Sequence, residues 1–313
     1  MKQCIIILVG GPSNEHEVSL KSGEQIFQNI DREKYDPIVV VIDRNLIWNI
    51  DGLEYSEIDA IFWIKQKDAI VFIALHGEYG EDGTVQALFE QSKIKFIGSS
   101  SICSKIAFDK AQSQEVFKKH GLHVPNTLCV GSKDVLPLEL YLPAIVKPSQ
   151  AGSSFGVSVV QKMSDLKNAV EHALLFDSCV LIQEMIIGAE VTCGILRIED
   201  KDIALPPTLI KATGDFFDFA SKYTKGGAIE VTPAPVSSDI YEAIQSVALA
   251  AHRALKCYGL SRTDMIIREN GEIVVLETNT IPGMTSASLL PQQAVAVGLD
   301  YQKLINTIIK SVR

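Results

Sequence analysis

Two short segments of alternating apolar and polar residues, joined by Asn270-Gly271, constrain the fold of this chain more than any other feature. They lie within the stretch LSRTDMIIRENGEIVVLETNTIPGMTSASL. An Asn-Gly dipeptide between two such segments predicts a β-hairpin with a two-residue turn. If these two residues form the turn, Asp264 lies opposite Glu277 and Arg262 lies opposite Asn279. All four side chains then point to one face of the hairpin.

The two faces of this predicted hairpin suit different environments. Two carboxylates directly opposite each other repel unless a cation lies between them. Two carboxylates and an amide oxygen form a hard, all-oxygen ligand set that suits Mg²⁺ completed by phosphates. The alternative is a solvated polar face with unpaired acids; the nearby arginine and the following loop, IPGM, favour the metal site. The opposite, core-facing side would consist of Met265, Ile267, Val274 and Leu276.

The composition limits the classes of protein to which the chain can belong. Its 313 residues are enough for two or three domains, and 47% hydrophobic with 21% charged residues is typical of a globular protein. A net charge of -9 argues against a nucleic-acid partner, which would need a basic face. No apolar run has membrane-spanning length, and Gly10-Gly11-Pro12 interrupts the apolar start, so a buried first strand is expected there rather than a signal peptide.

The cysteines are scattered and form no CxxC motif. They are therefore expected to be small core residues of a protein in a reducing compartment. The six are Cys4, Cys103, Cys129, Cys179, Cys193 and Cys257.

The N-terminal third predicts an α/β layer. Continuous apolar runs at 3–9, 37–43 and 69–75 are typical of buried parallel strands, and an amphipathic helix is expected from residue 15 or 16 to about residue 30. The third run is followed by HGEYGEDGTVQALFE, which places His76 and several acids at the carboxyl end of a strand. Open α/β sheets bind ligands at that end, although Asp82 alone is as well explained as a helix cap.

A second group of polar residues follows a helix expected at 109–120, which has Lys110 near its start. An apolar strand then ends at Lys147 and is followed by a loop with Gly152, Ser153, Ser154 and Gly156. Small residues let a backbone approach a phosphate and donate N–H groups to it, while lysines supply charge. A simple glycine-serine hairpin is the alternative, and the sequence alone leaves both open.

The rest of the chain alternates between helices and strands. A helix at 164–176, the strand VLIQEMI and a strand pair over roughly 191–210 are expected, then a helix at 238–258 before the hairpin and two more helices after it. Residues 212–235 are long, polar and aromatic-containing, which predicts a lid that packs over a site.

Several motifs in a fixed order give the chain a resemblance to a known family. GGPSNEHEVSL, HGEYGEDGTVQALFE, FDK, IVKPSQAGSSFG, FDFASKY, SRTD and LETNTIPGMTSASL together span nearly the whole chain. In these motifs the chain resembles the ATP-grasp enzymes and, among them, the D-alanine:D-alanine ligase family. The resemblance implies an α/β (α+β) fold of three domains: an N-terminal parallel-sheet domain (1–105), a central domain (106–184) and a C-terminal catalytic domain (185–313). ATP would lie between the last two.

The resemblance also implies a reaction and its partners. ATP would phosphorylate the carboxylate of one D-alanine, and the amine of a second D-alanine would displace phosphate from the D-alanyl phosphate to give D-alanyl-D-alanine for peptidoglycan. Such a family member would be cytoplasmic and homodimeric, would use Mg²⁺ or Mn²⁺, with a pair of ions, and would have no membrane or nucleic-acid partner. An acyl phosphate hydrolyses readily, which explains the need for a closing lid.

Residue roles are carried over motif by motif. The ATP phosphates would be held by Lys110, Lys147, Ser153, Ser154 and Lys222, the adenine by Glu184, Met185 and Ile186, and the ribose by Glu190. The metal ligands would be Asp264, Glu277 and Asn279. The tetrahedral oxyanion would be stabilised by Arg262 and the backbone N–H of Gly283. The substrates would contact Glu15, His76, Lys222 and Ser288, and Glu15, Ser153 and Tyr223 would link the three domains.

Two other functions remain open at this stage. A ligase that joins D-alanine to D-lactate or D-serine would share the fold, but the intact Tyr223 favours an amine acceptor. A nucleotide-binding protein without turnover would be expected to lack some of the charged residues listed above, all of which are present. The chain differs from the common family pattern at His16, Ala151 and Gln183.

Overall fold

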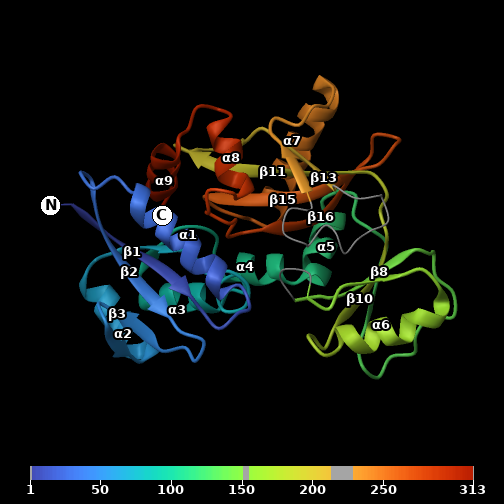
Figure 1. Ribbon diagram of the computed structural model, residues 1–313, viewed down its shortest axis with the longest axis horizontal. Helices are drawn as coiled ribbons and strands as arrows, with labels where there is room; N and C mark the ends of the chain where they lie inside the picture. The colour runs from blue at the N-terminus through green and yellow to red at the C-terminus, as the bar shows by residue number, and fades with distance from the viewer. Residues whose placement is uncertain (1, 151–154, 213–227, 313) are drawn as a thin grey trace.

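The computed structural model describes residues 2–150, 155–212 and 228–312, which form three sheets arranged from one end of the molecule to the other (Figure 1). The first sheet has the strand order β4-β3-β2-β1-β5-β6. Its central strands are parallel, as the apolar runs predicted, whereas β3 and β4 add an antiparallel edge that was not anticipated. The elements are β1 (Gln3–Gly10), α1 (His16–Asn29), β2 (Tyr35–Ile42), β3 (Trp48–Ile50), β4 (Leu53–Tyr55), α2 (Glu57–Gln66), β5 (Ile70–Ile73), α3 (Thr84–Ser92) and β6 (Lys95–Phe96).

The turn from β1 into α1 depends on glycine. Gly10 and Gly11 have φ angles of +89° and +90°, which side chains disfavour. A Cβ at Gly10 would also lie 2.2 Å from the carbonyl oxygen of Ile42 in β2. The chain therefore leaves the end of β1 closely packed against β2, and Glu15 lies at the start of α1 beside that sheet edge.

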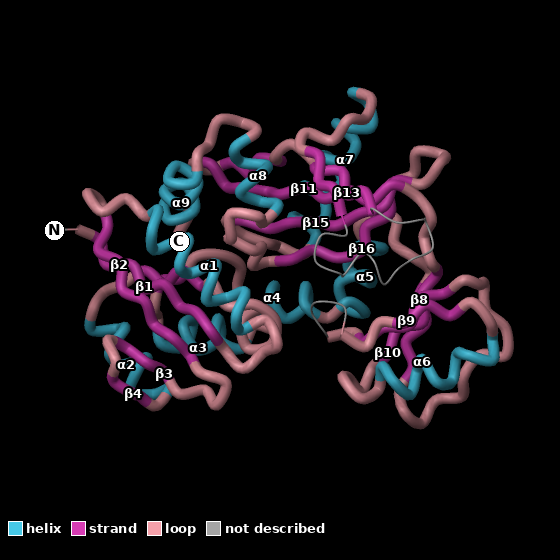
Figure 2. Tube along the Cα trace, in the orientation of Figure 1, coloured by secondary structure: helices cyan, strands magenta, loops and turns pink. Residues whose placement is uncertain are grey.

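The second sheet is antiparallel, with the order β7-β10-β8-β9, and lies at the opposite end of the molecule (Figure 2). Cys129 and Cys179 are joined by a disulfide in this unit, so the expectation that the cysteines are core thiols is wrong for these two. The elements are β7 (Thr127–Val130), β8 (Ala144–Pro148), β9 (Ser158–Val160), the 3-10 helix η1 (Met163–Asp165), α6 (Leu166–Ala173) and β10 (Val180–Glu184).

The third sheet lies between the other two and has the order β14-β13-β11-β15-β16, with β12 paired to β11. Two helices that precede the second sheet in the chain, α4 and α5, pack on this third sheet together with α7. The elements are α4 (Ser101–Phe108), α5 (Lys110–Lys119), β11 (Ala189–Ile198), β12 (Lys201–Ala204), β13 (Thr208–Ala212), β14 (Ala228–Val231), α7 (Ser238–Ala254), β15 (Leu260–Ile267), β16 (Ile273–Asn279), α8 (Leu289–Val295) and α9 (Tyr301–Lys310).

The predicted lid at 212–235 is only partly described. Residues 213–227, and with them the predicted site residues Lys222 and Tyr223, lie outside the described residues. Residues 228–231 form β14, antiparallel to β13, so the prediction of an irregular loop is wrong there.

The hydrophobic cores connect the units unequally. One cluster contains Ile5 and Ile7 of β1, Leu260 of β15 and Leu304 and Ile308 of α9, so the first unit and the third sheet share a core. Figure 1 shows α9 beside α1 at this junction. The buried residues of the second unit form a cluster of their own. Apolar packing therefore joins the first and third units much more strongly than it joins the second to either.

Candidate active site

The β15–β16 hairpin brings the four predicted polar residues together on one face. Asp264 lies opposite Glu277, and Arg262 lies opposite Asn279, as the sequence predicted. The route to this register differs from the predicted one. Arg268 and Glu272 close a loop that is one residue longer than the expected Asn270-Gly271 turn, and an irregularity after Asp264 restores the register at the site. A bulge of this kind shifts the pairing by one residue.

The same irregularity changes which residues face the core. Met265 pairs with Val275, and Ile267 pairs with Ile273, and all four belong to the core cluster on the helix-covered face. The prediction that Val274 and Leu276 share a face with Met265 and Ile267 is therefore wrong, whereas the prediction that Val274 is buried is confirmed. Val274 is buried opposite Ile266 on the other face, and Leu276 is only half-buried.

Arg262 and Asp264 form a two-bond ion pair. Arg262 donates from Nε to Asp264 Oδ1 (2.9 Å) and from Nη2 to Oδ2 (2.8 Å). Thr192 of β11, fully buried, donates from its hydroxyl to the same Oδ1 (2.5 Å). Burial alone would lower the pKa of Arg262, but Asp264, Glu277 and Glu81 raise it above its usual range. The guanidinium therefore stays charged at any pH at which the protein is folded.

Two lysines approach the hairpin from different units. Lys110 begins α5, and its Nζ lies 3.3 Å from Glu277 Oε2. Lys110 lowers the pKa of Glu277 to about 2, and Lys147 and Arg262 act in the same direction against the effect of burial. Burial and, to a smaller extent, the charge of Lys110 lower the pKa of Lys147, at the end of β8, to about 8, while Glu277 opposes the shift. An anion could bind between two cations arranged in this way.

The start of α5 is tied to the end of β8. Asp109 caps α5 by accepting from the N–H groups of Ala111 and Gln112. Its carboxylate also accepts from the hydroxyl of Ser149 (2.7 Å), and the N–H of Lys110 donates to the carbonyl oxygen of Ser149 (3.1 Å). These bonds fix the backbone that carries Lys110 beside the strand that carries Lys147.

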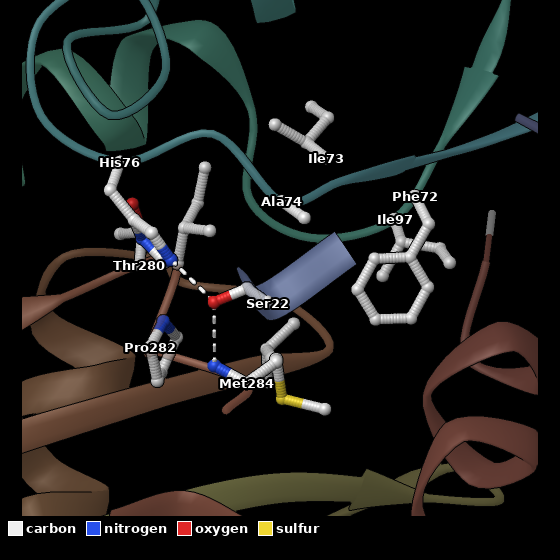
Figure 3. Close-up of a pocket in the computed structure, with 11 residues that line it drawn as sticks. Ser22, Phe72, Ile73, Ala74, His76, Ile97, Thr280, Pro282 and Met284 are labelled. Atoms are coloured by element: carbon white, nitrogen blue, oxygen red, sulfur yellow. Dashed lines mark hydrogen bonds between the residues drawn. The ribbon is translucent and has the colours of Figure 1, made fainter. Parts of the chain in front are cut away.

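The first unit contributes a buried histidine. His76 Nδ1 lies 3.5 Å from Glu81 Oε1, and His76 Nε2 lies 3.1 Å from the hydroxyl of Ser22 in α1. The N–H of Met284 donates to that same hydroxyl (3.4 Å), so Ser22 connects His76 to the glycine loop after β16 (Figure 3). With a proton on Nδ1, His76 donates to Glu81 and accepts from the hydroxyl of Ser22, which in turn accepts from the N–H of Met284. Burial raises the pKa of Glu81, and His76 offsets this only in part.

Glu15 and Gly77 lie next to each other on this side of the site. A Cβ placed on Gly77 would lie 3.1 Å from Glu15 Oε2. The charge of Glu15 also raises the pKa of Glu81, which in turn interacts with Arg262. The predicted substrate residues Glu15 and His76 are therefore on the same side of the hairpin as Arg262.

The loop after β16 places Gly283 against Ser288, which caps α8. A Cβ at Gly283 would lie 2.7 Å from the hydroxyl of Ser288. That hydroxyl accepts from the N–H of Thr285 (3.0 Å). Gly283 and Ser288, both predicted site residues, are thus in contact with each other.

The predicted adenine and ribose residues follow β10. The side chain of Glu184 pairs with Arg268 and accepts from Asn126. Met185 donates its N–H to the carbonyl oxygen of Pro143 (3.4 Å), Ile186 is buried, and Glu190 lies in β11 opposite Ile266. The remaining predicted residues of the phosphate loop, Ser153 and Ser154, lie outside the described residues.

The residues present fit a divalent cation. The side-chain oxygens of Asp264, Glu277 and Asn279 share one face, and they form the hard ligand set that Mg²⁺ or Mn²⁺ prefers. The described residues contain no group of three or more His, Cys, Asp or Glu side chains placed to hold a metal ion. Two carboxylates and an amide agree with a metal that takes its remaining ligands from phosphates and water.

Sequence reasoning assigned no role to three residues that support the site, Ser22, Asp109 and Thr192, and it placed Glu81 only among the acids at the carboxyl end of a strand. Ser22 and Thr192 contact the site from a distant part of the chain or from a neighbouring strand, whereas Asp109 directly precedes Lys110 and Glu81 follows His76 closely. Asp109 had a detectable signal, because aspartate directly before a helix is typical of an N-cap. The contact from Thr192 to Asp264 depends on the pairing of β11 with β15, which no local pattern indicates.

Comparisons with known proteins agree over nearly the whole length. The family model described as D-ala D-ala ligase C-terminus matches residues 119–310, and the D-ala D-ala ligase N-terminus model matches 4–63 and 54–99. A D-alanine--D-alanine ligase of Geotalea uraniireducens (strain Rf4) is 39% identical over 306 residues, covering 97% of this chain and 93% of that protein.

Solved structures show the same relationship. The VanG D-Ala:D-Ser ligase of Enterococcus faecalis superposes with a TM-score of 0.87 at 31% identity, covering 99% of both chains. The D-alanine--D-alanine ligase of Bacillus anthracis complexed with ATP has a TM-score of 0.83 at 32% identity, covering 99% of this chain and 97% of that one.

An α/β unit followed by two antiparallel sheets, with paired lysines and carboxylates between those sheets, defines an ATP-grasp protein. Within that class, the family models and the relatives leave one assignment. The chain belongs to the D-alanine–D-alanine ligase family. Among the residues that the structure describes, no helix combines the length and apolar character needed to cross a bilayer.

Proposed function

We propose that the charged residues around the β15–β16 hairpin catalyse the reaction of the D-alanine–D-alanine ligase family. The chain is an ADP-forming ligase. ATP phosphorylates the carboxylate of one D-alanine to give D-alanyl phosphate and ADP. The amine of a second D-alanine then attacks the acyl carbon, phosphate leaves, and D-alanyl-D-alanine is formed for peptidoglycan synthesis.

Lys110 and Lys147 would bind the phosphates of ATP. Their ammonium groups come from α5 and β8, and the pKa of Lys147 is lowered first by burial and then by the charge of Lys110. Phosphate oxygens between them would remove the repulsion between the two charges.

Arg262 and the N–H of Gly283 would stabilise the oxyanion of the tetrahedral intermediate. Preorganised donors in a partly buried site are effective at this task because they need little reorganisation. Asp264 fixes the guanidinium by two hydrogen bonds, so its orientation is set before substrate binds.

Asp264, Glu277 and Asn279 would hold Mg²⁺ or Mn²⁺, in a pair of ions. When bound, such ions would neutralise the negative charge of the phosphates. The low pKa of Glu277, caused by Lys110 and its neighbours, keeps this carboxylate ionised and ready to coordinate at neutral pH.

The substrates would be held on either side of Arg262. Glu15 would accept from the ammonium of the first D-alanine beside His76, and Ser288 would donate to the carboxylate of the second. Four residues lie outside the described residues and keep the roles that the resemblance implies. The phosphates would contact Ser153, Ser154 and Lys222, the second substrate would also contact Lys222, and Ser153 and Tyr223 would link the units. The nucleoside would contact Glu184, Met185, Ile186 and Glu190.

The observation that carries this proposal is the alternation of positive and negative charge at one face of the hairpin. Lys110 of α5 lies beside Glu277, and Arg262 lies beside Asp264. The test is D-alanine-dependent release of phosphate from ATP in the presence of Mg²⁺. Glu277→Gln should abolish release while the protein stays folded, whereas Glu171→Gln, on an exposed face of α6, should leave it unchanged. Phosphate release by Glu277→Gln at the wild-type rate would contradict the assigned roles.

The second substrate needs its own test because one similar structure is a D-Ala:D-Ser ligase. The matching curated relatives are named D-alanine--D-alanine ligases, which supports D-alanine as acceptor. A competition assay with equal D-alanine, D-serine and D-lactate at neutral pH should give mainly D-alanyl-D-alanine. A predominance of D-alanyl-D-serine would reassign the acceptor but leave the phosphoryl-transfer roles intact.

The domain limits 1–105, 106–184 and 185–313, a homodimeric state and a cytoplasmic location complete the proposal. The three sheets support the division in outline, although α4 and α5 pack with the third sheet. Sedimentation of the purified chain would test the dimer, and a monomer at working concentration would refute it.

A further inference from the structure

Polar contacts, rather than shared apolar packing, connect the second unit to the rest of the described molecule. Its buried hydrophobic residues form a separate cluster, while the first unit and the third sheet share one. Besides the hydrogen bond from Thr127 of β7 to Gln114 of α5, the polar connections lie in two places. One is the bond between Asp109 and Ser149 beside the phosphate lysines. The other is where the chain enters the unit at 120–126 and leaves it at 184–188.

The entering and leaving segments are bonded to each other. The N–H of Glu184 donates to the carbonyl oxygen of Asn126 (2.9 Å), and Asn126 donates from Nδ2 to Glu184 Oε2 (3.1 Å). Both segments also lie against the end of the β15–β16 hairpin. The N–H of Val275 donates to the carbonyl oxygen of His123 (2.8 Å), and a Cβ at Gly188 would lie 2.1 Å from the carbonyl oxygen of Ile267.

Arg268, at the tip of the hairpin, is at the centre of this junction. Its Nη2 donates to Glu184 Oε1 (2.7 Å), and its Nε lies 3.0 Å from Glu272 Oε2. Glu272 Oε1 in turn lies 2.9 Å from Nδ1 of His123 in the entering segment. The side chains of Arg268 and Glu184 are 31% and 25% exposed, so the pair is largely shielded from solvent.

The charges at the junction support one another. Burial raises the pKa of Glu184, but hydrogen bonds from Arg268 and Asn126 outweigh that effect and leave the pKa below its usual range. Since Glu184 ends β10, the carboxylate bound by Arg268 belongs to the same strand end that leads into Met185 and Ile186. A movement of Glu184 would therefore move the segment assigned to adenine.

We propose that Arg268 is a positioning residue for ATP: by binding Glu184 it sets the orientation of the second unit over the third sheet. It touches no reacting atom. The inference rests on the proposed assignment of Glu184, Met185 and Ile186 to the nucleoside. A weaker junction lets the second unit take more orientations, so a smaller fraction of the molecules has the orientation that binds ATP. The apparent affinity for ATP falls in proportion to that fraction.

The test compares the full-length wild type with Arg268→Gln, Arg268→Lys and the control Arg197→Gln. Arg197 of β11 also forms a 2.8 Å ion pair, with Asp202 of the neighbouring strand β12, and this pair lies away from the junction. Arg268→Gln should raise the KM for ATP and the dissociation constant of ADP about 5- to 30-fold, with kcat and the KM for D-alanine within about twofold. Arg268→Lys should show an intermediate rise because lysine keeps the charge but not the planar group. Arg197→Gln should change none of these constants.

Two further measurements separate positioning from a general loss of structure. Hydrogen exchange should increase in 120–126 and 184–188 of Arg268→Gln and stay unchanged in β1 and β15. In the double variant Arg268→Gln/Glu184→Gln, the ADP dissociation constant should equal that of Glu184→Gln alone, because both changes break one interaction.

Unchanged ADP binding in Arg268→Gln, additive effects in the double variant, or an equal effect of Arg197→Gln would each overturn the proposal. A failure of the proposed ligase function is distinguishable from these outcomes. It would appear as absent D-alanine-dependent phosphate release in the wild type, whereas ADP binding and hydrogen exchange would still test the role of Arg268.

Discussion

The hydrogen bond from Thr192 to Asp264 offers the sharpest test of how the site is held. Thr192 lies opposite Asp264 in the β11–β15 pair and is fully buried. Its hydroxyl donates to Asp264 Oδ1 at 2.5 Å and also lies 3.2 Å from the carbonyl oxygen of Thr263. Thr192→Val removes this donor and leaves a side chain of nearly the same shape.

The size of the effect follows from the number and type of bonds lost. Asp264 keeps both hydrogen bonds from Arg262, so the variant loses a single bond to a charged acceptor. Such a bond contributes about 1.5–3 kcal/mol to folding. Removal of a hydrogen-bond partner that orients a metal-binding carboxylate typically lowers the metal affinity by about 10- to 100-fold. We therefore expect Thr192→Val to fold, to lose about 1.5–3 kcal/mol of unfolding free energy and to need about tenfold more Mg²⁺ for half-maximal activity.

Urea unfolding and Mg²⁺ titration of phosphate release measure the two effects separately. Thr278→Val is the matched control, because the Thr278 hydroxyl bonds to that of Thr263 (2.9 Å) on the opposite face of the hairpin. The control should lose about 0.5–1.5 kcal/mol of stability without a change in the Mg²⁺ midpoint. If the two variants share the same Mg²⁺ midpoint, Thr192 does not orient Asp264 and the reasoning is refuted.

Three further predictions concern charge and packing. Lys147, with a pKa of about 8, is charged below that pH and neutral above it; the KM for ATP should therefore rise as pH increases through 8, and Lys147→Arg should flatten this profile. Gly283→Ala would place a Cβ 2.7 Å from the Ser288 hydroxyl and should raise the KM of the second D-alanine by roughly tenfold, with ADP binding unchanged. Gly23→Ala would place a Cβ 2.1 Å from Val9 Cγ1 and should cost about 1–3 kcal/mol in urea unfolding; an unchanged midpoint would show that α1 can shift freely on β1.

The hairpin shows how far local pattern carries and where it stops. Alternation and the Asn270-Gly271 dipeptide predicted the pairing of Asp264 with Glu277, and the pairing is correct because the longer turn and the irregularity after Asp264 offset each other. The same pattern predicted a turn that is one residue too short. It also placed Val274 and Leu276 on the helix-covered face, where Ile273 and Val275 lie. A bulge is chosen by the packing of both strands against their helices, and the sequence of the hairpin alone carries little of that information.

Contacts between distant segments were the least predictable part. The Cys129–Cys179 disulfide joins residues 50 positions apart, and its pairing depends on β7 lying beside β10. The bond from the N–H of Met284 to the hydroxyl of Ser22 depends on α1 meeting the loop after β16. Neither has a periodic signal, whereas the apolar runs of the first sheet did, since burial on both faces requires continuous apolar sequence.

The two lysines that we propose to bind the phosphates of ATP come from different units of the structure. Lys110 belongs to α5, whose core residues pack with the third sheet, whereas Lys147 belongs to β8 of the second unit. The pKa of Lys147 is lowered mainly by burial and also by the charge of Lys110, and the repulsion between the two cations opposes close approach of the units. An anion bound between them removes the repulsion and favours the approach. Since the other contacts between the second unit and the third sheet are polar, a bound nucleoside triphosphate can shift the orientation of the second unit with a few hydrogen bonds. The apolar core that the first and third units share keeps Arg262, Glu15 and His76 in one fixed arrangement.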